Sequence, residues 1–399
     1  MLQIGKSFIK KVILKKLAVV ISHPIQYYSP VFEKLALCCD LMVFYTLGIE
    51  NTDQFDNGFK RKISWDLPLL KGYNYTFIDN VAAKPGYYFK GVVNPGLITA
   101  IKNFNPSAIL IYGWSYQSHL KAMKYFKNKV PIWFRGDSTL LDQFPIYKRL
   151  TRKLFLTWVY KHIDLAFFVG TQNQKYFKAH GLKTEQLIFT PHAVDNDRFG
   201  QNRLPEALAL RKDLSISSHD ILILFAGKFE EKKDPLLLLK AFVELNRSNT
   251  HLLFVGNGEL EKTLKIESKE QKAISSRIHF MDFQNQSQMP VIYQACDLFC
   301  LPSKGPNETW GLAVNEAMAA GKAVLVSNKV GSATDLTFPA ENGYIFKSAD
   351  QRDLTEKLDI ITDLQTLDLF GKRSKEIIQY WSFTEQVSVF IEKLHESIR

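Results

Sequence analysis

Cysteine is scarce in this chain of 399 residues, which has four in total. Cys38 and Cys39 are adjacent, and Cys296 and Cys300 are separated by three residues, so neither pair matches a common zinc or redox motif. Buried thiols in a reducing compartment are the interpretation that this usage favours. We therefore expect a cytoplasmic location.

Long apolar runs are also missing. No run reaches the ~18 residues that a membrane-spanning helix needs. Residues 1–22 are basic and then apolar, but they lack a small-residue cleavage site, so their apolar part is better interpreted as a buried strand than as a signal peptide. The length and the hydrophobic content of 46% suit two domains, each with its own core.

Acidic residues are few in the first half of the chain. Residues 1–199 hold 27 Lys and Arg against 13 Asp and Glu, whereas residues 200–399 hold 24 against 27. This asymmetry indicates that the first half meets something anionic. Nucleic acid, an anionic membrane surface and an acidic substrate all fit the charge, although no interleaved base-stacking motif favours nucleic acid.

Apolar, strand-like runs alternate with helical patterns along the whole chain, which predicts an α/β fold of two doubly wound, Rossmann-like domains facing a cleft. The predicted strands are 17–22, 41–46, 107–113, 130–135, 164–170, 220–227, 251–258, 277–283, 297–303 and 323–327. The clearest predicted helices are 29–37, with Ser29 as N-cap and Pro30 at the first position, 142–162 and 235–246.

A polar, weakly patterned stretch at 196–218 predicts the domain boundary. We expect an amino-terminal domain at 1–200 and a second domain at 201–380. Residues 381–399 read as a terminal amphipathic helix that packs back toward the first domain. Polar clusters follow several predicted strands, and ligands bind at the carboxyl ends of parallel strands and between domains. These clusters are 23–28, 135–138, 227–228 and 303–310.

The stretch 305–321, GPNETWGLAVNEAMAAG, carries the strongest chemical signal. A helix beginning near Gly311 has free first-turn amides and a dipole that favour phosphate, and the glycine lets backbone approach a ligand. Glu308 precedes this helix and is expected to face the cleft. Glu316 lies inside it, where a carboxylate can accept hydrogen bonds from ribose hydroxyls. Lys228, Lys232 and Lys233 follow another strand end and can neutralise a diphosphate.

These features together suit a nucleotide sugar, and the residues around them resemble a known family. Residues 301–346 resemble retaining glycosyltransferases of family 4, which have the two-domain GT-B fold. The matching signature is E-x7-E, from Glu308 to Glu316. Residues 227–242 resemble the family's Gly-Arg-x4-Lys segment, with Lys228 in place of the arginine and Lys233 matching the lysine.

Further segments fall in family order, so the resemblance covers nearly the whole chain. FVGNGEL, HFMDF, YQACDLFCLPS and ENGYIF belong to the second half, whereas SHPIQYYSP, FRGDSTLLD, VGTQNQKYF and PHAVDNDRF look like a bacterial branch. The family's Gly-Gly loop after the first strand is absent, and HPIQ at 23–26 stands in its place.

The resemblance implies a metal-independent hexosyltransferase without a cofactor, whose donor is a nucleotide-diphosphate sugar. Family frequency favours a UDP sugar. Glu308 is then expected to contact donor-sugar hydroxyls and Glu316 the ribose, while Lys228 and Lys233 hold the diphosphate. The candidate catalytic residues are Glu308, Lys233, Lys228 and His23. The candidate nucleotide-sugar-binding residues are Glu316, Gly311, Leu312, Trp310, Gly227, Asn257 and Phe283. The candidates for the acceptor or the donor sugar are Gln26, Tyr27, His119, Arg135 and Asp137.

Several alternatives stay open. His23 is either catalytic or a cap of its turn, and His119 is either a donor-sugar contact or structural. The segment 195–197 has the D-x-D form of a metal site but lies at the family's domain-closing turn, so we expect no metal there. A nucleotide-sugar epimerase shares the architecture and would interconvert its substrate without an acceptor. A non-catalytic protein that binds nucleotide sugars or nucleic acid would show no turnover.

The basic first half has a candidate use, since the first domain of this fold binds the acceptor. In residues 4–13 the apolar side chains fall on one helical side and the lysines on the other, as a membrane-surface helix requires. Residues 148–162 add aromatic and basic side chains. We therefore expect a peripheral position at the inner face of the cell membrane and a lipid-linked or cell-surface glycan acceptor, as in lipopolysaccharide or other polysaccharide biosynthesis.

Overall fold

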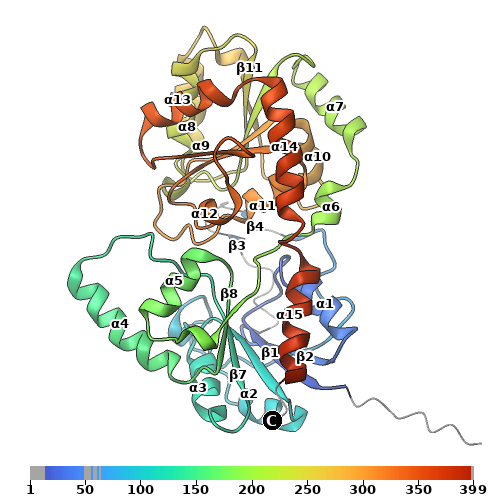
Figure 1. The fold of residues 1–399 in the computed structure, drawn as a ribbon, viewed down its shortest axis with the longest axis vertical. Helices are drawn as coiled ribbons and strands as arrows, with labels where there is room; N and C mark the ends of the chain where they lie inside the picture. The colour runs from blue at the N-terminus through green and yellow to red at the C-terminus, as the bar shows by residue number, and fades with distance from the viewer. Residues whose placement is uncertain (1–13, 49–54, 57–60, 63, 397–399) are drawn as a thin grey trace, which may run out of the picture.

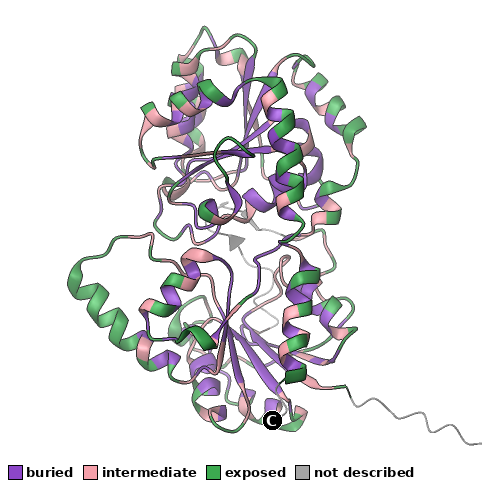
Figure 2. Ribbon diagram, viewed as in Figure 1, coloured by how far each residue is buried: buried purple, intermediate pink, exposed green. Residues whose placement is uncertain are grey.

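The computed structural model describes residues 14–48, 55–56, 61–62 and 64–396. Figure 1 shows two α/β domains, with the amino-terminal half of the chain below and most of the carboxy-terminal half above. Both sheets are parallel, and their inner strands are almost wholly buried (Figure 2). The predicted fold of two doubly wound, Rossmann-like domains is confirmed.

Alternation within single strands explains why each domain has two buried clusters, one on each face of its sheet. In the first strand, Leu17 and Val19 join one cluster, whereas Ala18 and Val20 join the other. Side chains of a strand point alternately to the two faces, so a continuous apolar run is buried on both sides. The central strand of the second domain repeats this arrangement.

The amino-terminal sheet has seven strands in the order β5-β2-β1-β6-β7-β8-β9, all paired in parallel. These strands are β1 (Lys16–Ile21), β2 (Asp40–Tyr45), β5 (Asn74–Phe77), β6 (Ala108–Tyr112), β7 (Ile132–Arg135), β8 (Leu165–Phe168) and β9 (Leu187–Phe189). A short antiparallel pair, β3 (Phe55–Asp56) and β4 (Arg61–Lys62), stands apart from this sheet. The helices of this part are α1 (Ser29–Ala36), η2 (Phe89–Gly91), α2 (Leu97–Phe104), α3 (Gln117–Phe126), α4 (Ile146–Tyr160), α5 (Thr171–Ala179) and η3 (Thr184–Gln186).

The carboxy-terminal sheet has six parallel strands in the order β12-β11-β10-β13-β14-β15. They are β10 (Ile221–Ala226), β11 (Thr250–Val255), β12 (Ile278–Met281), β13 (Leu298–Leu301), β14 (Ala323–Ser327) and β15 (Gly343–Phe346). The remaining helices are α6 (Asn196–Gly200), α7 (Leu204–Asp213), η4 (Glu231–Lys233), α8 (Pro235–Leu245), α9 (Glu261–Glu270), η5 (Ser275–Arg277), α10 (Met289–Ala295), α11 (Leu312–Ala319), α12 (Ala333–Leu336), α13 (Gln351–Ile361), α14 (Leu364–Ile378) and α15 (Phe383–Glu396).

The last helix, α15, lies on the amino-terminal domain beside α1 (Figure 1). The Phe390 ring packs against Trp133 and Phe167, with ring centroids 6.5 and 4.7 Å apart, and joins the core of the first sheet. The chain therefore passes between the domains twice, once before α6 and once after α14.

The predicted cap of the first helix is wrong. Ser29 is the first residue of α1 rather than its N-cap, and Tyr28 precedes it without a side-chain cap. The reason is the turn before the helix, in which the Tyr28 and Ser29 amides already donate to the carbonyl of Ile25 at 2.9 Å. Pro30 stands at the second position, which also tolerates proline.

Other predicted elements differ from the structure in their ends, and one stretch predicted without regular structure is helical. The helix predicted over 142–162 begins at Ile146, after Pro145. The weakly patterned stretch at 196–218 holds α6 and α7. Asp195 is the N-cap of α6, because its carboxylate accepts the Arg198 amide at 3.0 Å. The amphipathic segment predicted at 4–13 lies outside the described residues. In the part of the chain that the structure covers, no helix is long and apolar enough to cross a bilayer.

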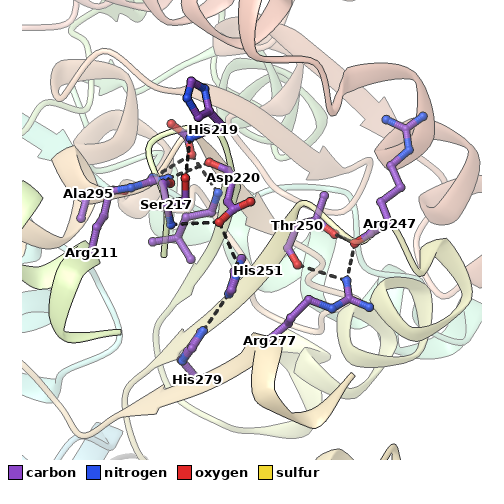
Figure 3. A network of polar contacts seen from close by, with 12 residues as sticks. Arg211, Ser217, His219, Asp220, Arg247, Thr250, His251, Arg277, His279 and Ala295 are labelled. Atoms are coloured by element: carbon purple, nitrogen blue, oxygen red, sulfur yellow. Dashed lines mark hydrogen bonds and ion pairs between the residues drawn. The ribbon is translucent and has the colours of Figure 1, made fainter. Parts of the chain in front are cut away.

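A network of polar side chains lies at the amino ends of the strands in the second domain (Figure 3). The Asp220 carboxylate lies 3.7 Å from Nε2 of His251, whose Nδ1 lies 3.0 Å from Nε2 of His279. Arg211 donates to the backbone of Ser217 and Asp220 in the same network. The contacts join β10, β11 and β12 at the edge opposite their carboxyl ends.

Candidate active site

A cavity of about 370 Å³ lies between the two domains, at the carboxyl ends of strands from both sheets. The amino-terminal domain contributes loops that follow β1 and β7, and the other domain contributes loops after β10, β12 and β13 together with the start of α11. Twelve residues expected at the site line it: Gln26, Tyr27, Asp137, Gly227, Lys228, Lys233, Phe283, Glu308, Trp310, Gly311, Leu312 and Glu316.

Glu308 and Lys233 form an ion pair in this cavity. Lys233 Nζ lies 2.5 Å from Glu308 Oε2, and the Ser303 hydroxyl donates to the same oxygen at 2.9 Å. The glutamate is buried. Next to this pair, the Lys304 amide donates to the carbonyl of Lys232 at 2.8 Å, which joins the loop after β13 to η4. A negative and a positive group are held side by side, facing the space between the domains.

The helix α11 points its amino terminus at the same space. Gly311 precedes it with φ +90°, and an added Cβ would meet Val330 Cγ1 at 2.9 Å and Leu301 Cδ2 at 3.1 Å. Glycine is required there because other residues rarely adopt this backbone conformation and have no room for a side chain. Leu312 and Ala313 line the cavity beside it. First-turn amides have no partner within their own helix, so this end suits an anion.

Glu316, one turn further along α11, is buried and accepts two hydrogen bonds. Tyr27 of the amino-terminal domain donates to Oε1 at 2.9 Å, and Tyr293 of α10 donates to Oε2 at 2.8 Å. Burial raises the pKa of the Glu316 carboxyl above its usual value, against the effect of the two tyrosine hydroxyls. Each carboxylate oxygen has two lone pairs, so capacity remains for further donors.

Four expected site residues do not line the cavity: His23, His119, Arg135 and Asn257. His119 is completely buried, with Nε2 2.9 Å from the Thr46 hydroxyl and Nδ1 3.0 Å from the carbonyl of Gly113. Burial lowers its pKa to about 4. In this structure it is a core residue of the first domain, and its hydrogen bonds are made with protein groups.

Arg135, His23 and Asn257 also have structural partners. Arg135 is buried and donates to the carbonyls of Thr190 and Pro191, each at 3.0 Å, so it supports the segment that leads toward the second domain. The His23 Nδ1 lies 2.9 Å from the Ser22 hydroxyl, and burial lowers the pKa of this imidazole to about 4.

Asn257 stands behind the cavity wall and orients it. Its Oδ1 accepts the Phe283 amide at 2.8 Å, while its amide group donates to Glu261 and Asp282. Asn257 therefore does not line the cavity itself, but it positions Phe283, which does.

Some lining residues were missed by sequence reasoning, notably Trp65, His192 and Tyr293. Trp65 comes from the first domain, and its ring lies 6.2 Å from that of Phe283 in the second. No local pattern marks it, because the contact exists only across the domain interface. Tyr293 lies in a segment, 293–303, that resembles the family. Its place in the helix that precedes α11, which carries Glu316, is the feature from which it could have been predicted.

Hydrogen bonds join the two domains around the cavity. Thr309 donates to Asp137 at 2.7 Å, and the Asn307 amide donates to Asp142 at 2.8 Å. Asp137 thus both lines the cavity and holds the loop that carries Glu308.

Within the described ranges, no group of three or more His, Cys, Asp or Glu side chains is placed to hold a metal ion.

Residues 207–380 match the family model for glycosyl transferases group 1, which covers the carboxy-terminal domain and less than half of the chain. The chain is 31% identical over 189 residues to the lipopolysaccharide 1,2-N-acetylglucosaminetransferase of Salmonella typhimurium (strain LT2), an alignment that covers 45% of this chain and 48% of that protein. The match therefore spans about half the length of this curated relative.

Solved structures resemble the whole chain. Anabaena Alr3699/HepE, in complex with UDP and glucose, superimposes with a TM-score of 0.70 at 16% identity and covers 96% of this chain and 100% of its own. WaaG, a glycosyltransferase involved in lipopolysaccharide biosynthesis, gives a TM-score of 0.64 at 14% identity, covering 95% and 99% of the two chains. At these identities the likeness shows the fold, which is the GT-B arrangement of two Rossmann-like domains.

Proposed function

We propose that this chain is a retaining glycosyltransferase that moves a sugar from a nucleotide-diphosphate sugar to a glycan acceptor. The observation that carries the proposal is the cavity itself, in which the Lys233–Glu308 pair, the start of α11 and Glu316 converge. A cation and free amides suit a diphosphate, while carboxylates suit sugar and ribose hydroxyls. The match of residues 207–380 to glycosyl transferases group 1 supports it.

In the proposed reaction the protein stabilises the departing nucleoside diphosphate. Lys233 and Lys228 supply positive charge, and the amides at Gly311 and Leu312 supply hydrogen-bond donors. Glu308 orients the donor sugar through its hydroxyls, and Glu316 does the same for the ribose. Bond breaking then depends on electrostatic stabilisation and positioning rather than on a metal ion. Residues of the first domain, such as Gln26 and Tyr27, are proposed to face the acceptor.

The donor and the acceptor are proposed from the relatives. A UDP sugar is favoured because Alr3699/HepE binds UDP and glucose. A lipid-linked or cell-surface glycan is favoured because the Salmonella relative acts on lipopolysaccharide and WaaG takes part in lipopolysaccharide biosynthesis. The excess of positive charge in residues 1–199 supports an anionic membrane surface as a partner. We propose a cytoplasmic location, peripheral to the inner face of the membrane.

A ligand panel followed by a turnover assay tests the function. The full chain is mixed with UDP, GDP, ADP and their sugars, and the melting temperature is recorded. A donor at ~100 times its Kd stabilises the folded state by ~2.7 kcal/mol. Release of the free nucleotide is then measured with and without a lipid-linked glycan.

Three outcomes of this assay separate the candidate functions. Acceptor-dependent release of the nucleotide supports the transferase. Interconversion of the sugar without an acceptor identifies an epimerase instead. Stabilisation without any turnover identifies a binding protein, and no stabilisation by any nucleotide contradicts the proposal.

A further inference from the structure

Two aromatic rings from different domains meet in the wall of the cavity. Trp65 of the first domain and Phe283 of the second both line it, with ring centroids 6.2 Å apart and ring planes inclined at 65°. Inclined rings form a corner rather than a slot, so a flat group that stacks on the face of one ring meets the other ring at an angle. Gln284 lines the cavity next to this pair.

Packing of the protein core does not account for Trp65. The residue is only partly buried, and it belongs to none of the four clusters of buried hydrophobic residues in the described part of the chain. Large aromatic side chains contribute most to stability when they are buried. A tryptophan that faces a cavity instead indicates contact with a ligand.

Both sequence neighbours of Trp65 are hydrogen-bonded to the second domain. The Ser64 carbonyl accepts a hydrogen bond from the Asn285 side-chain amide at 2.7 Å, and the Asp66 carboxylate accepts one from the Ser287 backbone amide at 3.1 Å. We call Ser64, Trp65 and Asp66 the strap. Because each end of the strap is anchored on the other domain, the indole between them is held at the cavity.

The loop after β12 is also fixed from within the second domain. Asn257 accepts the Phe283 amide at 2.8 Å, and Arg198 donates to the Gln286 side chain through Nη2 at 2.7 Å. Loop and strap are therefore both held in place before a ligand arrives. Such preorganisation lowers the entropy that is lost when a ligand binds.

The strand order gives the direction in which a donor lies across the cavity. Phe283 follows β12 and Glu308 follows β13, and β11 and β10 lie between these two strands in the sheet. Three strand spacings of ~4.8 Å separate the two ends by ~14 Å. Lys228 and Lys233 follow β10 and stand between them. A donor with its sugar at Glu308 and its diphosphate at the lysines therefore directs its base toward the aromatic pair.

We propose that Trp65 and Phe283 together bind the nucleobase of the donor, so that the two domains share its recognition. The inference rests on the proposed function and assigns one part of its substrate to named side chains. Every base has a π face, so stacking recognises a planar base as a class without distinguishing one base from another. Because Trp65 belongs to the first domain, a bound base also stabilises the facing arrangement of the domains.

The test compares a nucleoside diphosphate with inorganic pyrophosphate, which lacks the base. The full chain is titrated by calorimetry with UDP, GDP and ADP, and the tightest of the three is used for the variants. Trp65→Ala is expected to weaken binding of this nucleotide at least about tenfold, as loss of one base stack does, and to leave pyrophosphate binding unchanged. Trp65→Phe keeps a ring and is expected to stay within about threefold of the parent.

Asp66 acts on the base through Trp65 and is therefore a positioning residue. Asp66→Ala is expected to weaken nucleotide binding about threefold through one lost hydrogen bond. Asp66→Asn should restore the affinity, since its amide oxygen still accepts the Ser287 amide. The double variant Trp65→Ala, Asp66→Ala is expected to bind no more weakly than Trp65→Ala alone, because the two residues act as a unit. Additive losses would show that Asp66 does not act through the indole.

Trp158→Ala is the matched control. Trp158 is a tryptophan of the same domain that is 40% exposed and does not line the cavity. Its replacement is expected to change the affinity for neither the nucleotide nor pyrophosphate. All variants should keep the parent's melting temperature, because none of the replaced side chains belongs to a buried cluster.

Two results would overturn the inference and leave the proposed function in place. One is unchanged nucleotide binding by Trp65→Ala, and a raised KM for the acceptor in that variant would then assign the indole to the acceptor. The other is an equal loss of nucleotide and pyrophosphate binding, which would mean that the variant disturbs the whole cavity. Failure of the parent to bind any of the three nucleotides would contradict the proposed function itself, and the inference with it.

Discussion

At the scale of single residues, the pairing of Lys233 with Glu308 is the feature with the most chemical consequence. The cation lies 2.5 Å from a buried carboxylate, so it is held in place before any donor arrives. An incoming diphosphate would meet a positioned charge rather than a mobile one, and little reorganisation would be needed. The carboxylate, in turn, keeps its other contact with Ser303.

Replacing Lys233 tests this arrangement. Lys233→Ala is expected to lower kcat/KM by about 10²–10³-fold, because one charge on the leaving group is lost. Lys304→Ala is the matched control, since Lys304 pairs with Glu231 and Asp234 nearby but does not line the cavity. Initial rates with a saturating acceptor measure the effect. Unchanged kcat/KM in the Lys233 variant would refute its role.

The two glutamates are expected to behave differently when replaced. Glu308→Ala should mainly remove turnover or sugar preference, whereas Glu316→Ala should mainly weaken nucleotide binding. Glu316→Ala also leaves the Tyr27 and Tyr293 hydroxyls without their acceptor, which destabilises the fold by ~1–3 kcal/mol for each unpaired group.

Glu316→Gln separates the two effects of that change, since an amide oxygen still accepts hydrogen bonds while the charge is gone. We expect the glutamine variant to melt near the parent and to bind the nucleotide about tenfold more weakly, as calorimetry would show. Equal binding and turnover in all three variants and the parent would mean that these carboxylates do not form the site.

At the scale of elements, the start of α11 depends on one glycine. Gly311→Ala is expected to destabilise the protein by ~1–2 kcal/mol through its left-handed backbone, beyond the close approach to Val330. The variant should also bind the nucleotide more weakly. Gly96→Ala is the control, because Gly96 precedes α2 with φ −77° and an added Cβ meets nothing within 4 Å. Urea unfolding measures both variants, and equal stabilities would contradict this account.

The histidine pair that joins β11 and β12 predicts a dependence of stability on pH. Burial, then the neighbouring His251, lowers the pKa of His279 from 6.5 to about 4. Its contribution to stability is therefore complete above pH 6.5 and is lost as the pH falls toward 4, because only the unfolded state binds the proton in this range. Partial solvent exposure limits the effect, so we expect ~1 kcal/mol by pH 5.

A His279→Gln variant makes this contribution visible. The difference in unfolding free energy between the parent and the variant should shrink as the pH is lowered from 7 to 5. His219→Gln is the control variant, because His219 joins the network through its backbone amide, which donates to the Ser217 hydroxyl at 3.2 Å, and its side chain is exposed (Figure 3). A constant difference between the parent and the His279 variant would show that the pair does not titrate as argued.

At the scale of the whole molecule, the distribution of positive charge determines which protein groups can neutralise the phosphates of a donor. Lysines from the loops after β10 and the dipole of α11 converge on the cavity from the second domain, while the first domain carries the excess positive charge. In the described residues the cavity gathers cations and helix amides rather than a ligand set for a metal ion. We therefore expect the donor's phosphates to be met by protein groups.

Chelation tests that expectation. Transferase activity should be the same with and without EDTA, because the diphosphate would be neutralised by Lys228, Lys233 and backbone amides. Initial rates in chelated buffer, with and without added Mg²⁺ or Mn²⁺, measure it. Complete loss of activity with EDTA and recovery with either ion would assign the neutralisation to a metal.

Local sequence was sufficient for the fold class and for one side of the site. Apolar runs alternating with helical patterns predicted the strands of both sheets except the edge strands β5, β9 and β15. A strand that is buried on both faces has a continuous apolar run of its own, so its sequence alone reveals it. Glu308, Gly311, Glu316 and Lys233 come from two short motifs, each next to a single strand, so order and spacing were enough to place them together.

Tertiary structure alone decided the other side. Trp65 reaches the cavity, and Tyr27 bonds to Glu316, only because the two domains face each other. Arg135 ends β7 and His119 lies in the first turn of α3, both near the carboxyl ends of strands where ligands bind, yet the packing of the first domain buries both. Whether a polar side chain faces a ligand or a neighbouring carbonyl depends on contacts with residues far away in the chain. A short segment of sequence holds no information about such distant contacts. It does hold the alternation that marks a strand and the residues that form the turn before a helix.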